Sequence, residues 1–438
     1  MIRMREFLLG AVLAAGWMSC VTVQYNADIS DYHRQIAALE SQLVRNPDDA
    51  GALRDLGAIY FEVKQYPRAE ALLKKSYDLD GKDAKTLFYY GMSLEFQSKP
   101  QAALAVYINF SDFSELSPYR TLMEGRYRSL TLDLIHQQLR DLIAREDSLT
   151  GGTLPSKSVA VFPLDFEGGN ERFSPLGKGL SEMITIDLGQ VKGLSLIERV
   201  RVEALLDELK LSQSTLVDPS SAPRLGKLLS AGRIVAGSYS VSKEEQLTLN
   251  VASWDVVKKQ YPKTASQSDA LDNLFRLEKE LVFDVIKKLG IKLTASERTA
   301  IQHIPTKNMQ AFMMYSIGLD KEDAHDFEAA KVYFGQAASL DPGFERAKGK
   351  TEAMGAMSVA GGDKSKALTY AQSVDPLPSP DVNPNKSDLM TNRLQTLGNG
   401  IGSNFYPGQE SRKPAQEAAA SGELGAELPP PPPPPPGK

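Results

Sequence analysis

Few residues of this chain have the types and the spacing that catalysis or metal binding requires. Cys20 is the only cysteine, so a fold held together by internal disulfides is excluded. The four histidines, His33, His136, His303 and His325, lie in different segments, and no two have the spacing of a local metal-binding motif. The sequence therefore predicts neither a metal site nor a cofactor.

A glycine-rich stretch that starts at Gly168 is similar to a phosphate-binding loop only at first sight. Such a loop needs a glycine five residues before its Gly-Lys pair and Ser or Thr after it. Those two positions hold Arg172 and Gly179. Ser174 and Pro175 instead predict a helix start, as an N-cap followed by the first helical residue. No Ser/His/Asp grouping is visible either, and we expect that the protein is not an enzyme.

The position of Cys20 is more informative than its thiol chemistry. The residue ends a segment in which Arg3 and Arg5 precede an apolar run over residues 7–17, the layout of a secretory signal. The run is too short to cross a bilayer as a helix, which takes about 20 apolar residues. A cysteine at this junction resembles the lipid-attachment site of bacterial lipoproteins, where the thiol is acylated and the chain is cut before it.

The lipoprotein resemblance implies that residues 1–19 are a signal peptide and that Cys20 carries the lipid, with palmitate among its acyl chains. Val21 stands where Asp would favour retention in the inner membrane, so the resemblance implies anchoring at the periplasmic face of the outer membrane. Of the three residues before the cysteine, only Ser19 fits the family pattern well. A plain secretory signal with an incidental cysteine, or an uncleaved anchor, therefore stays open.

Composition limits the class of protein further. A chain of 438 residues with 42% hydrophobic and 24% charged residues is typical of two or three globular domains. The net charge of −5 argues against binding to nucleic acid, which requires a basic surface. No segment after Cys20 is long and apolar enough to span a membrane as a helix. We therefore expect membrane attachment either through lipid on Cys20 or through strands in an assembly.

An internal period of 34 residues follows the signal segment. Gly57, Gly91 and Gly125 are each 34 residues apart, as are Ala69 and Ala103. Small and aromatic residues recur around them in the same order. The pattern resembles the tetratricopeptide repeat, a helix–turn–helix unit of that length.

This resemblance implies an all-α repeat domain over residues 20–148, with a capping helix at 31–45 and one long helix at 118–146. A further copy with a covering helix after it implies a second repeat domain over residues 305–360. One repeat alone cannot bury its apolar face. We therefore expect this copy to pack on the middle domain, on its covering helix or on a partner.

Stacked repeats of this family typically bind peptides or protein segments on a concave surface. Placing the motif on this chain predicts six partner-binding residues there: Arg54, Phe61, Phe88, Met92, Phe96 and Arg126. Aromatic and arginine side chains are common binding anchors where they are exposed. The alternative is that each aromatic residue fills the core between repeats. We expect envelope or secreted proteins as partners.

Residues 155–295 have a different pattern, in which short apolar runs alternate with helical spacing. Strands are predicted at residues 158–164, 194–198, 233–241, 246–254 and about 259–266, and helices at 176–188, 201–211, 223–229 and 271–289. Strands mixed with helices and ending in a three-strand meander predict an α/β domain, with helices packed on a mixed sheet.

The order of these elements resembles the periplasmic domain of the curli secretion channel family, the CsgG type, and more distantly the N-terminal domain of TolB. The resemblance rests on residues 159–163, on 196–199 followed by 205–209, and on 234–238 followed by a hairpin. The expected fold class is therefore multidomain, with all-α tetratricopeptide repeats flanking a CsgG-like and TolB-like α/β domain.

The chain departs from the curli channel family where channel subunits insert two membrane hairpins. A membrane hairpin needs roughly 20 residues, because each strand takes about 9–11. The first insertion point holds only residues 242–245 here. At the second, residues 267–289 have the charged pattern of an amphipathic helix rather than strict alternation. We therefore expect a channel-like domain that does not line a channel.

The helical periodicity fades from about residue 361, where the tail is expected to begin. Residues 373–438 are rich in Pro, Ser, Asn and Gly and include an unbroken run of eight prolines at 429–436. This composition predicts a disordered tail, with polyproline II structure in the proline run. The run is either a docking strip for an aromatic groove, a spacer, or a low-complexity end without a partner.

Together these patterns predict a non-enzymatic outer-membrane lipoprotein. It would act as a periplasmic scaffold or adaptor in the secretion or assembly of a surface structure. Two alternatives stay open. One is a subunit of a homo-oligomeric CsgG-like secretion ring, which the missing hairpins disfavour. The other is a periplasmic binding or sensing module.

Overall fold

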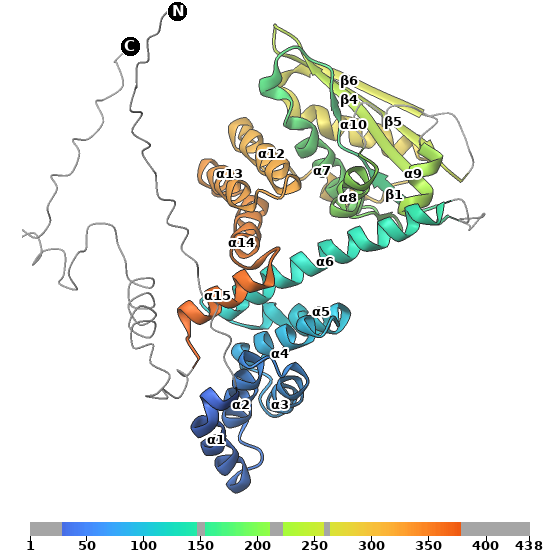
Figure 1. Ribbon diagram of the computed structural model, residues 1–438. Helices are drawn as coiled ribbons and strands as arrows, with labels where there is room; N and C mark the ends of the chain where they lie inside the picture. The colour runs from blue at the N-terminus through green and yellow to red at the C-terminus, as the bar shows by residue number, and fades with distance from the viewer. Residues whose placement is uncertain (1–28, 147–153, 211–221, 258–262, 378–438) are drawn as a thin grey trace, which may run out of the picture.

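The computed structural model describes residues 29–146, 154–210, 222–257 and 263–377. The predicted signal peptide, Cys20 and the proline run lie outside the described residues. Within them, the chain forms an N-terminal helical array, a central α/β domain and a C-terminal helical array (Figure 1). No helix among these residues has the length and apolar character needed to cross a membrane.

The N-terminal array consists of α1 His33–Arg45, α2 Ala50–Glu62, α3 Tyr66–Leu79, α4 Ala84–Phe96, α5 Pro100–Tyr107 and α6 Pro118–Ala144. Local sequence explains several starts. The carboxylates of Asp49 and Asp83 cap α2 and α4 by accepting backbone N–H groups of the first turn. Pro100 and Pro118 begin α5 and α6, where a missing N–H costs nothing. The single long helix predicted from residue 118 is present.

The glycine period has a packing reason. A Cβ added at Gly57 would lie 2.7 Å from Cγ of Leu73, and one at Gly91 would lie 2.1 Å from Cε1 of Tyr107. Both distances are shorter than any real contact of a Cβ atom. Glycine therefore lets α2 approach α3, and α4 approach α5, more closely than any other residue would allow.

The C-terminal array consists of α12 Met309–Asp323, α13 Phe327–Leu340, α14 Glu345–Ala360 and α15 Lys364–Val374. Helix α14 packs both on α13 and on α6. At the second contact, a Cβ on Gly125 of α6 would lie 2.3 Å from the carbonyl oxygen of Ala356 in α14. Helix α14 therefore takes the place that the second helix of a third N-terminal pair would occupy.

The expectation that the disordered tail begins at residue 361 is wrong. Helix α15 follows directly, with Asp363 capping its first turn. Ala360, Ala367 and Ala371 are buried in the core of the N-terminal array. The composition of this segment does not predict an ordered helix. The alanines are buried against helices about 250 residues earlier in the chain, and local composition does not include that contact.

The α/β domain is built on a six-stranded sheet in the order β3-β1-β4-β5-β6, with β2 paired to β4. Its strands are β1 Ser158–Val161, β2 Asp165–Phe166, β3 Ser195–Leu196, β4 Arg233–Val241, β5 Gln246–Asp255 and β6 Lys263–Ala270. β1 runs parallel to β3 and β4, whereas β4, β5 and β6 form an antiparallel meander. The mixed sheet is as predicted, with β6 a few residues later in the chain than expected.

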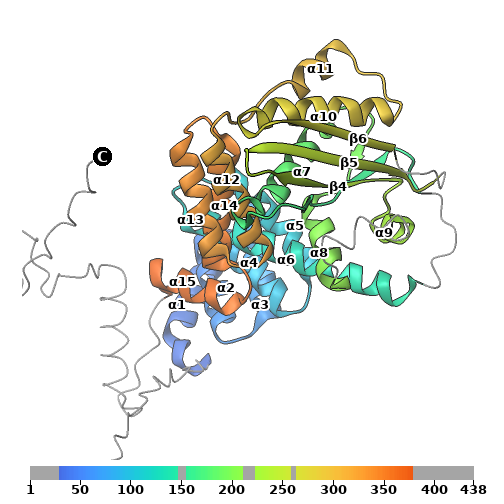
Figure 2. The ribbon, with the colours of Figure 1, turned by 90° about the horizontal axis from the view of Figure 1, so that it is seen from above.

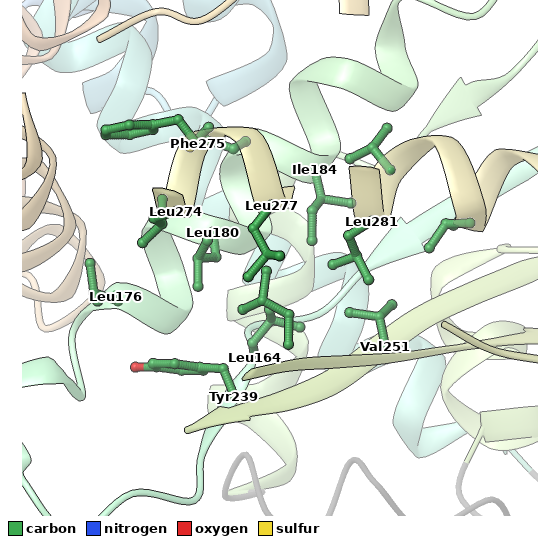
Figure 3. Packing of buried hydrophobic residues seen from close by; sticks show 14 of the residues in the cluster. Leu164, Leu176, Leu180, Ile184, Tyr239, Val251, Leu274, Phe275, Leu277 and Leu281 are labelled. Carbon is green, nitrogen blue, oxygen red and sulfur yellow. The ribbon is translucent and has the colours of Figure 1, made fainter. Parts of the chain in front are cut away.

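Helices cover both faces of this sheet: α7 Leu176–Gly189, α8 Arg199–Leu209, α9 Ala222–Leu229, α10 Leu274–Lys288 and the short α11 Ala295–Ile301. Because alternate residues of a strand face opposite sides, Val159 and Val161 of β1 face one core while Ala160 and Phe162 face the other. The first core holds α7 and α10 against the sheet (Figure 3), and Figure 2 shows α10 running lengthwise beside β5 and β6.

The second core of the sheet contains part of the N-terminal array. Ile135 and Leu139 from the far half of α6 pack with α8, α9 and the strands. The first half of the same helix, with Leu122 and Met123, belongs to the core of the N-terminal array. Helix α6 is therefore one continuous helix that packs in the N-terminal array at its start and in the α/β domain at its end (Figure 1).

Candidate functional site

The structure places most of the predicted partner-binding residues inside the N-terminal array. Phe61, Phe88 and Met92 are buried, and Phe96 is partly buried. The rings of Phe61 and Phe96 meet edge to face with centroids 5.5 Å apart. Tyr66 stacks on Phe96 at 4.9 Å. The aromatic residues therefore fill the core between helix pairs, which was the alternative to the binding-anchor prediction.

Arg126 is also buried, and it forms the centre of a contact between the two helical arrays. Its guanidinium donates to both carboxylate oxygens of Glu95, at 3.0 and 2.6 Å. It also donates to the carbonyl oxygens of Ala360 at 3.1 Å and Gly362 at 2.8 Å, at the end of α14. The Tyr107 hydroxyl donates to the same Glu95 carboxylate at 2.9 Å. A cation at a helix C-terminus is favoured by the carbonyl groups that point towards it.

Arg54 has a local role. It is half-buried, and it forms ion pairs with Asp55 at 2.8 Å and with Asp83 at 3.0 Å. Hydrogen bonding to Asp55, against the opposing effect of partial burial, raises the pKa of the guanidinium further above its usual range. Asp83 is the N-cap of α4, so Arg54 ties α2 to the start of the next helix pair.

Helix α15 lies against the first helices of the N-terminal pairs, the surface predicted to bind partners. Nζ of Lys364 in α15 lies 4.3 Å from the ring centroid of Phe96 in α4. Farther along, Gln372 donates to Glu62 of α2 at 3.0 Å. Just past the helix end, Asp375 pairs with Lys85 of α4 at 2.8 Å.

The contact at Asp375 extends to α6, because the Tyr119 hydroxyl donates to the same carboxylate at 2.8 Å. Burial raises the pKa of Asp375, but the hydrogen bonds from Lys85 and Tyr119 outweigh it and lower the pKa overall. A segment of the chain itself therefore contacts α2, α4 and α6 together through charged and polar groups.

The C-terminal array is joined to the α/β domain by a network of charges. Arg199 of α8 lies 2.5 Å from Asp323 and 3.0 Å from Glu322, both at the end of α12. Lys178 of α7 lies 2.9 Å from the other oxygen of Asp323. Burial and the nearby Asp323 carboxylate raise the pKa of Glu203 to about 8, so Glu203 is mostly protonated at neutral pH.

Glu182 of α7 is a second buried acid at this junction. It accepts hydrogen bonds from the Tyr315 hydroxyl and from Arg346, each at 2.8 Å. Burial alone would raise its pKa, but the nearby Lys350, Arg199 and Arg346 lower the pKa to about 2. Glu182 therefore stays ionised and links α7 to α12 and α14.

The histidines are less scattered in space than in sequence. The rings of His136 in α6 and His325 in the turn after α12 have centroids 6.4 Å apart. Asp207 of α8 brings a carboxylate to the same place. His33 is an exposed residue at the start of α1. The sequence predicts no metal site, because no two histidines have the spacing of a metal-binding motif. Spacing along the chain does not show that His136 and His325 lie close together in the fold.

The turn between β4 and β5 lies at the first point where a channel subunit was expected to insert a membrane hairpin. It consists of residues 242–245 and is closed by backbone hydrogen bonds from Ser242 to Gln246 and from Glu245 to Ser242. Beyond β6, α10 is a helix that packs on β5 and β6. Both features agree with the sequence-based expectation.

Residues 155–244 match the family model of CsgG, the curli production assembly/transport component. The match runs from just before β1 to the β4–β5 turn. It covers less than half of the chain, and we call the α/β domain that contains it the CsgG-like domain. The resemblance expected from the sequence is therefore confirmed for this segment.

Among solved structures, the LpoB C-terminal domain from Salmonella enterica is similar over 31% of this chain and 98% of its own, at 14% sequence identity and a TM-score of 0.23. At this TM-score the likeness is weak. A comparison with curated protein sequences gave no match.

Proposed function

We propose that this protein is a non-enzymatic, lipid-anchored scaffold at the periplasmic face of the outer membrane. Its CsgG-like domain would dock into an assembly that secretes or builds a surface structure. The family match over residues 155–244 supports the envelope setting. The basic and apolar start of the chain, ending at Cys20, supports export and lipid attachment.

The observation that carries the scaffold proposal is the packing of both helical arrays against the CsgG-like domain. Helix α6 packs on α8 and α9, which cover one face of the sheet, and α12 packs on α7, which covers the other. The arrays also contact each other through Arg126 and α15. At the β4–β5 turn, four residues leave no room for a membrane hairpin. A domain held in this way is suited to presenting a fixed surface.

We assign the helix pairs to the tetratricopeptide class on the 34-residue period and on the close approach at Gly57 and Gly91. In this proposal the arrays bind envelope or secreted proteins. Because α15 contacts the first helices of the N-terminal pairs, a partner that uses this surface must displace α15. A partner that leaves α15 in place must use other faces.

Cell fractionation with Cys20→Ser tests the anchoring. A single acyl chain binds membranes only marginally, whereas several chains hold stably, so loss of the attachment site should move the protein to the soluble periplasmic fraction. The wild-type chain is the matched control. Retention of the variant in the membrane after a salt wash would contradict lipid anchoring.

Two further measurements separate a scaffold from a pore subunit. Affinity purification of the tagged chain from membranes, followed by mass spectrometry, should recover other envelope proteins at defined stoichiometry. The purified chain should form no conducting pores in planar bilayers. Recovery of the chain alone as a large conducting ring would refute the scaffold proposal and favour the homo-oligomeric alternative.

A further inference from the structure

Three potential metal ligands meet where the three parts of the protein come together. His136 lies on α6 of the N-terminal array, Asp207 on α8 of the CsgG-like domain, and His325 in the turn between α12 and α13. One ligand atom from each residue lies within 4.8 Å of the other two. Two of the four histidines of the chain are therefore found at one point with a carboxylate.

The ring of His136 is held in an orientation suited to metal binding. Its Nδ1 lies 2.8 Å from Oε1 of Glu208, which also accepts a hydrogen bond from Arg140 at 2.7 Å. The pairing with the Arg140 guanidinium holds the Glu208 carboxylate in place as an acceptor. With Nδ1 donating to this carboxylate, Nε2 is the ring nitrogen left to bind a metal ion.

This arrangement is the usual support for a metal-binding histidine. Ligating imidazoles almost always donate their second ring nitrogen to a carboxylate or carbonyl, which fixes the tautomer and raises ligand basicity. Glu208 occupies that supporting position for His136. Arg140 balances the charge of Glu208, so the net charge offered to an incoming cation comes from Asp207.

His325 has a fixed backbone and an exposed ring. Its φ angle is +57°, and its N–H donates to the carbonyl oxygen of Glu322 at 3.0 Å. Lys64 and Ser98 have the same backbone conformation at the turns after α2 and α4, so it belongs to the turn itself. The exposed ring packs edge to face against Phe327, with centroids 5.9 Å apart.

Two imidazole nitrogens and one carboxylate oxygen are a donor set for a borderline divalent ion. Zn²⁺ binds histidine nitrogen and carboxylate oxygen at about 2.0–2.2 Å, which places ligand atoms about 3.3 Å apart in a tetrahedral site. The three ligand atoms here lie within 4.8 Å of one another, so small side-chain movements are enough to reach that spacing. Asp207 and His325 are exposed and can change rotamer to do so.

We propose that His136, Asp207 and His325 bind a divalent transition-metal ion, with Zn²⁺ as the preferred ion. Three protein ligands leave a fourth position open to water or to a donor from another molecule. Each ligand belongs to a different part of the chain. The ion would therefore fasten the N-terminal array, the CsgG-like domain and the C-terminal array to one another.

Isothermal titration calorimetry of the chelator-treated full chain with zinc chloride tests the site, using a protein without a histidine tag. We expect one ion per chain, and a rise of a few degrees in Tm when zinc is in large excess over Kd. Calcium and magnesium should not compete, because they prefer all-oxygen sites. Cobalt should give the visible absorption of a tetrahedral ion.

The matched variants are His325→Ala and Asp207→Asn, both at exposed positions that should not affect folding. Each should weaken zinc binding at least tenfold and abolish the cobalt absorption. His33→Ala, at an exposed histidine of α1, is the control and should bind zinc like the wild type. Unchanged zinc binding in His325→Ala, or no binding by the wild type below millimolar zinc, would overturn the proposal.

Discussion

Arg126 is the residue whose loss should open the contact between the two helical arrays. We propose its replacement by methionine, which keeps the apolar stem of the side chain and removes the guanidinium with its charge. Four hydrogen bonds disappear, two to Glu95 and one each to the carbonyls of Ala360 and Gly362. Among the described residues, the Glu95 carboxylate then keeps the hydrogen bond from the Tyr107 hydroxyl.

The magnitude follows from burial. The side chains of Arg126 and Glu95 are each only 3% exposed, so solvent does not screen the carboxylate that remains. Removing one partner of a buried ion pair typically costs about 3–5 kcal/mol. The freed carbonyls at the end of α14 add to this loss wherever water does not reach them. We therefore expect Arg126→Met to lower the stability of the contact by about 3–5 kcal/mol.

Hydrogen exchange is the assay, because it reports local opening. Amides of α15 and of the last turn of α14 should exchange about 10²- to 10³-fold faster in the variant, and more where the larger cost applies. The control is Arg128→Met, two residues away on the same helix. Arg128 is 43% exposed and pairs with Glu124, so its loss should change stability by less than about 1 kcal/mol.

A double variant separates the two contributions. In Glu95→Gln combined with Arg126→Met no buried charge is left unpaired, so part of the lost stability should return. Exchange in α15 that is unchanged by Arg126→Met, or equally fast in Arg128→Met, would refute the idea that this ion pair holds the arrays together.

Two more predictions concern the cores. Burial and the neighbouring Asp187 carboxylate raise the pKa of Glu278 to about 8. A carboxyl group whose pKa is raised by folding stabilises the folded state fully when the pH is below its pKa in the unfolded chain. This stabilisation is lost as the pH rises through about 8. The Tm of Glu278→Gln should therefore vary less between pH 5 and 8 than the Tm of the wild type, and it should be higher at pH 8. If the variant and the wild type had the same pH profile, Glu278 would not be the source of the pH dependence. Gly91→Ala should cost about 1–3 kcal/mol in denaturant unfolding, because the new Cβ would meet the buried ring of Tyr107. Gly189→Ala, with no atom within 4 Å of the added Cβ, is its control, and an equal loss in both variants would contradict the packing argument.

Local patterns predicted much of the secondary structure. The long helix from Pro118, the β4–β5 hairpin and the helix after β6 all appear where hydrophobic spacing and turn residues placed them. These features depend on residues close in sequence. The glycine period was equally readable, because each helix pair closes on itself within 34 residues.

Contacts between distant segments could not be predicted in the same way. The aromatic residues assigned to a binding surface are compatible with an exposed anchor or a core residue, and only the packing of neighbouring helices decides between them. Helix α15 looks like a tail until its alanines meet the N-terminal array. His136 and His325 are brought together by three elements, none of which carries a local metal-binding signature.

The placement of α14 against Gly125 has a consequence for the order of events during synthesis and export. Helix α6 emerges long before α14, because more than 200 residues separate Gly125 from Ala356. The face of α6 around Gly125 therefore stays uncovered until the C-terminal array has been synthesised and exported. Such long-range closure is slow compared with the local pairing of α2 with α3. A chain that stops before α14 would keep this face open, so closure of the arrays distinguishes complete molecules from truncated ones.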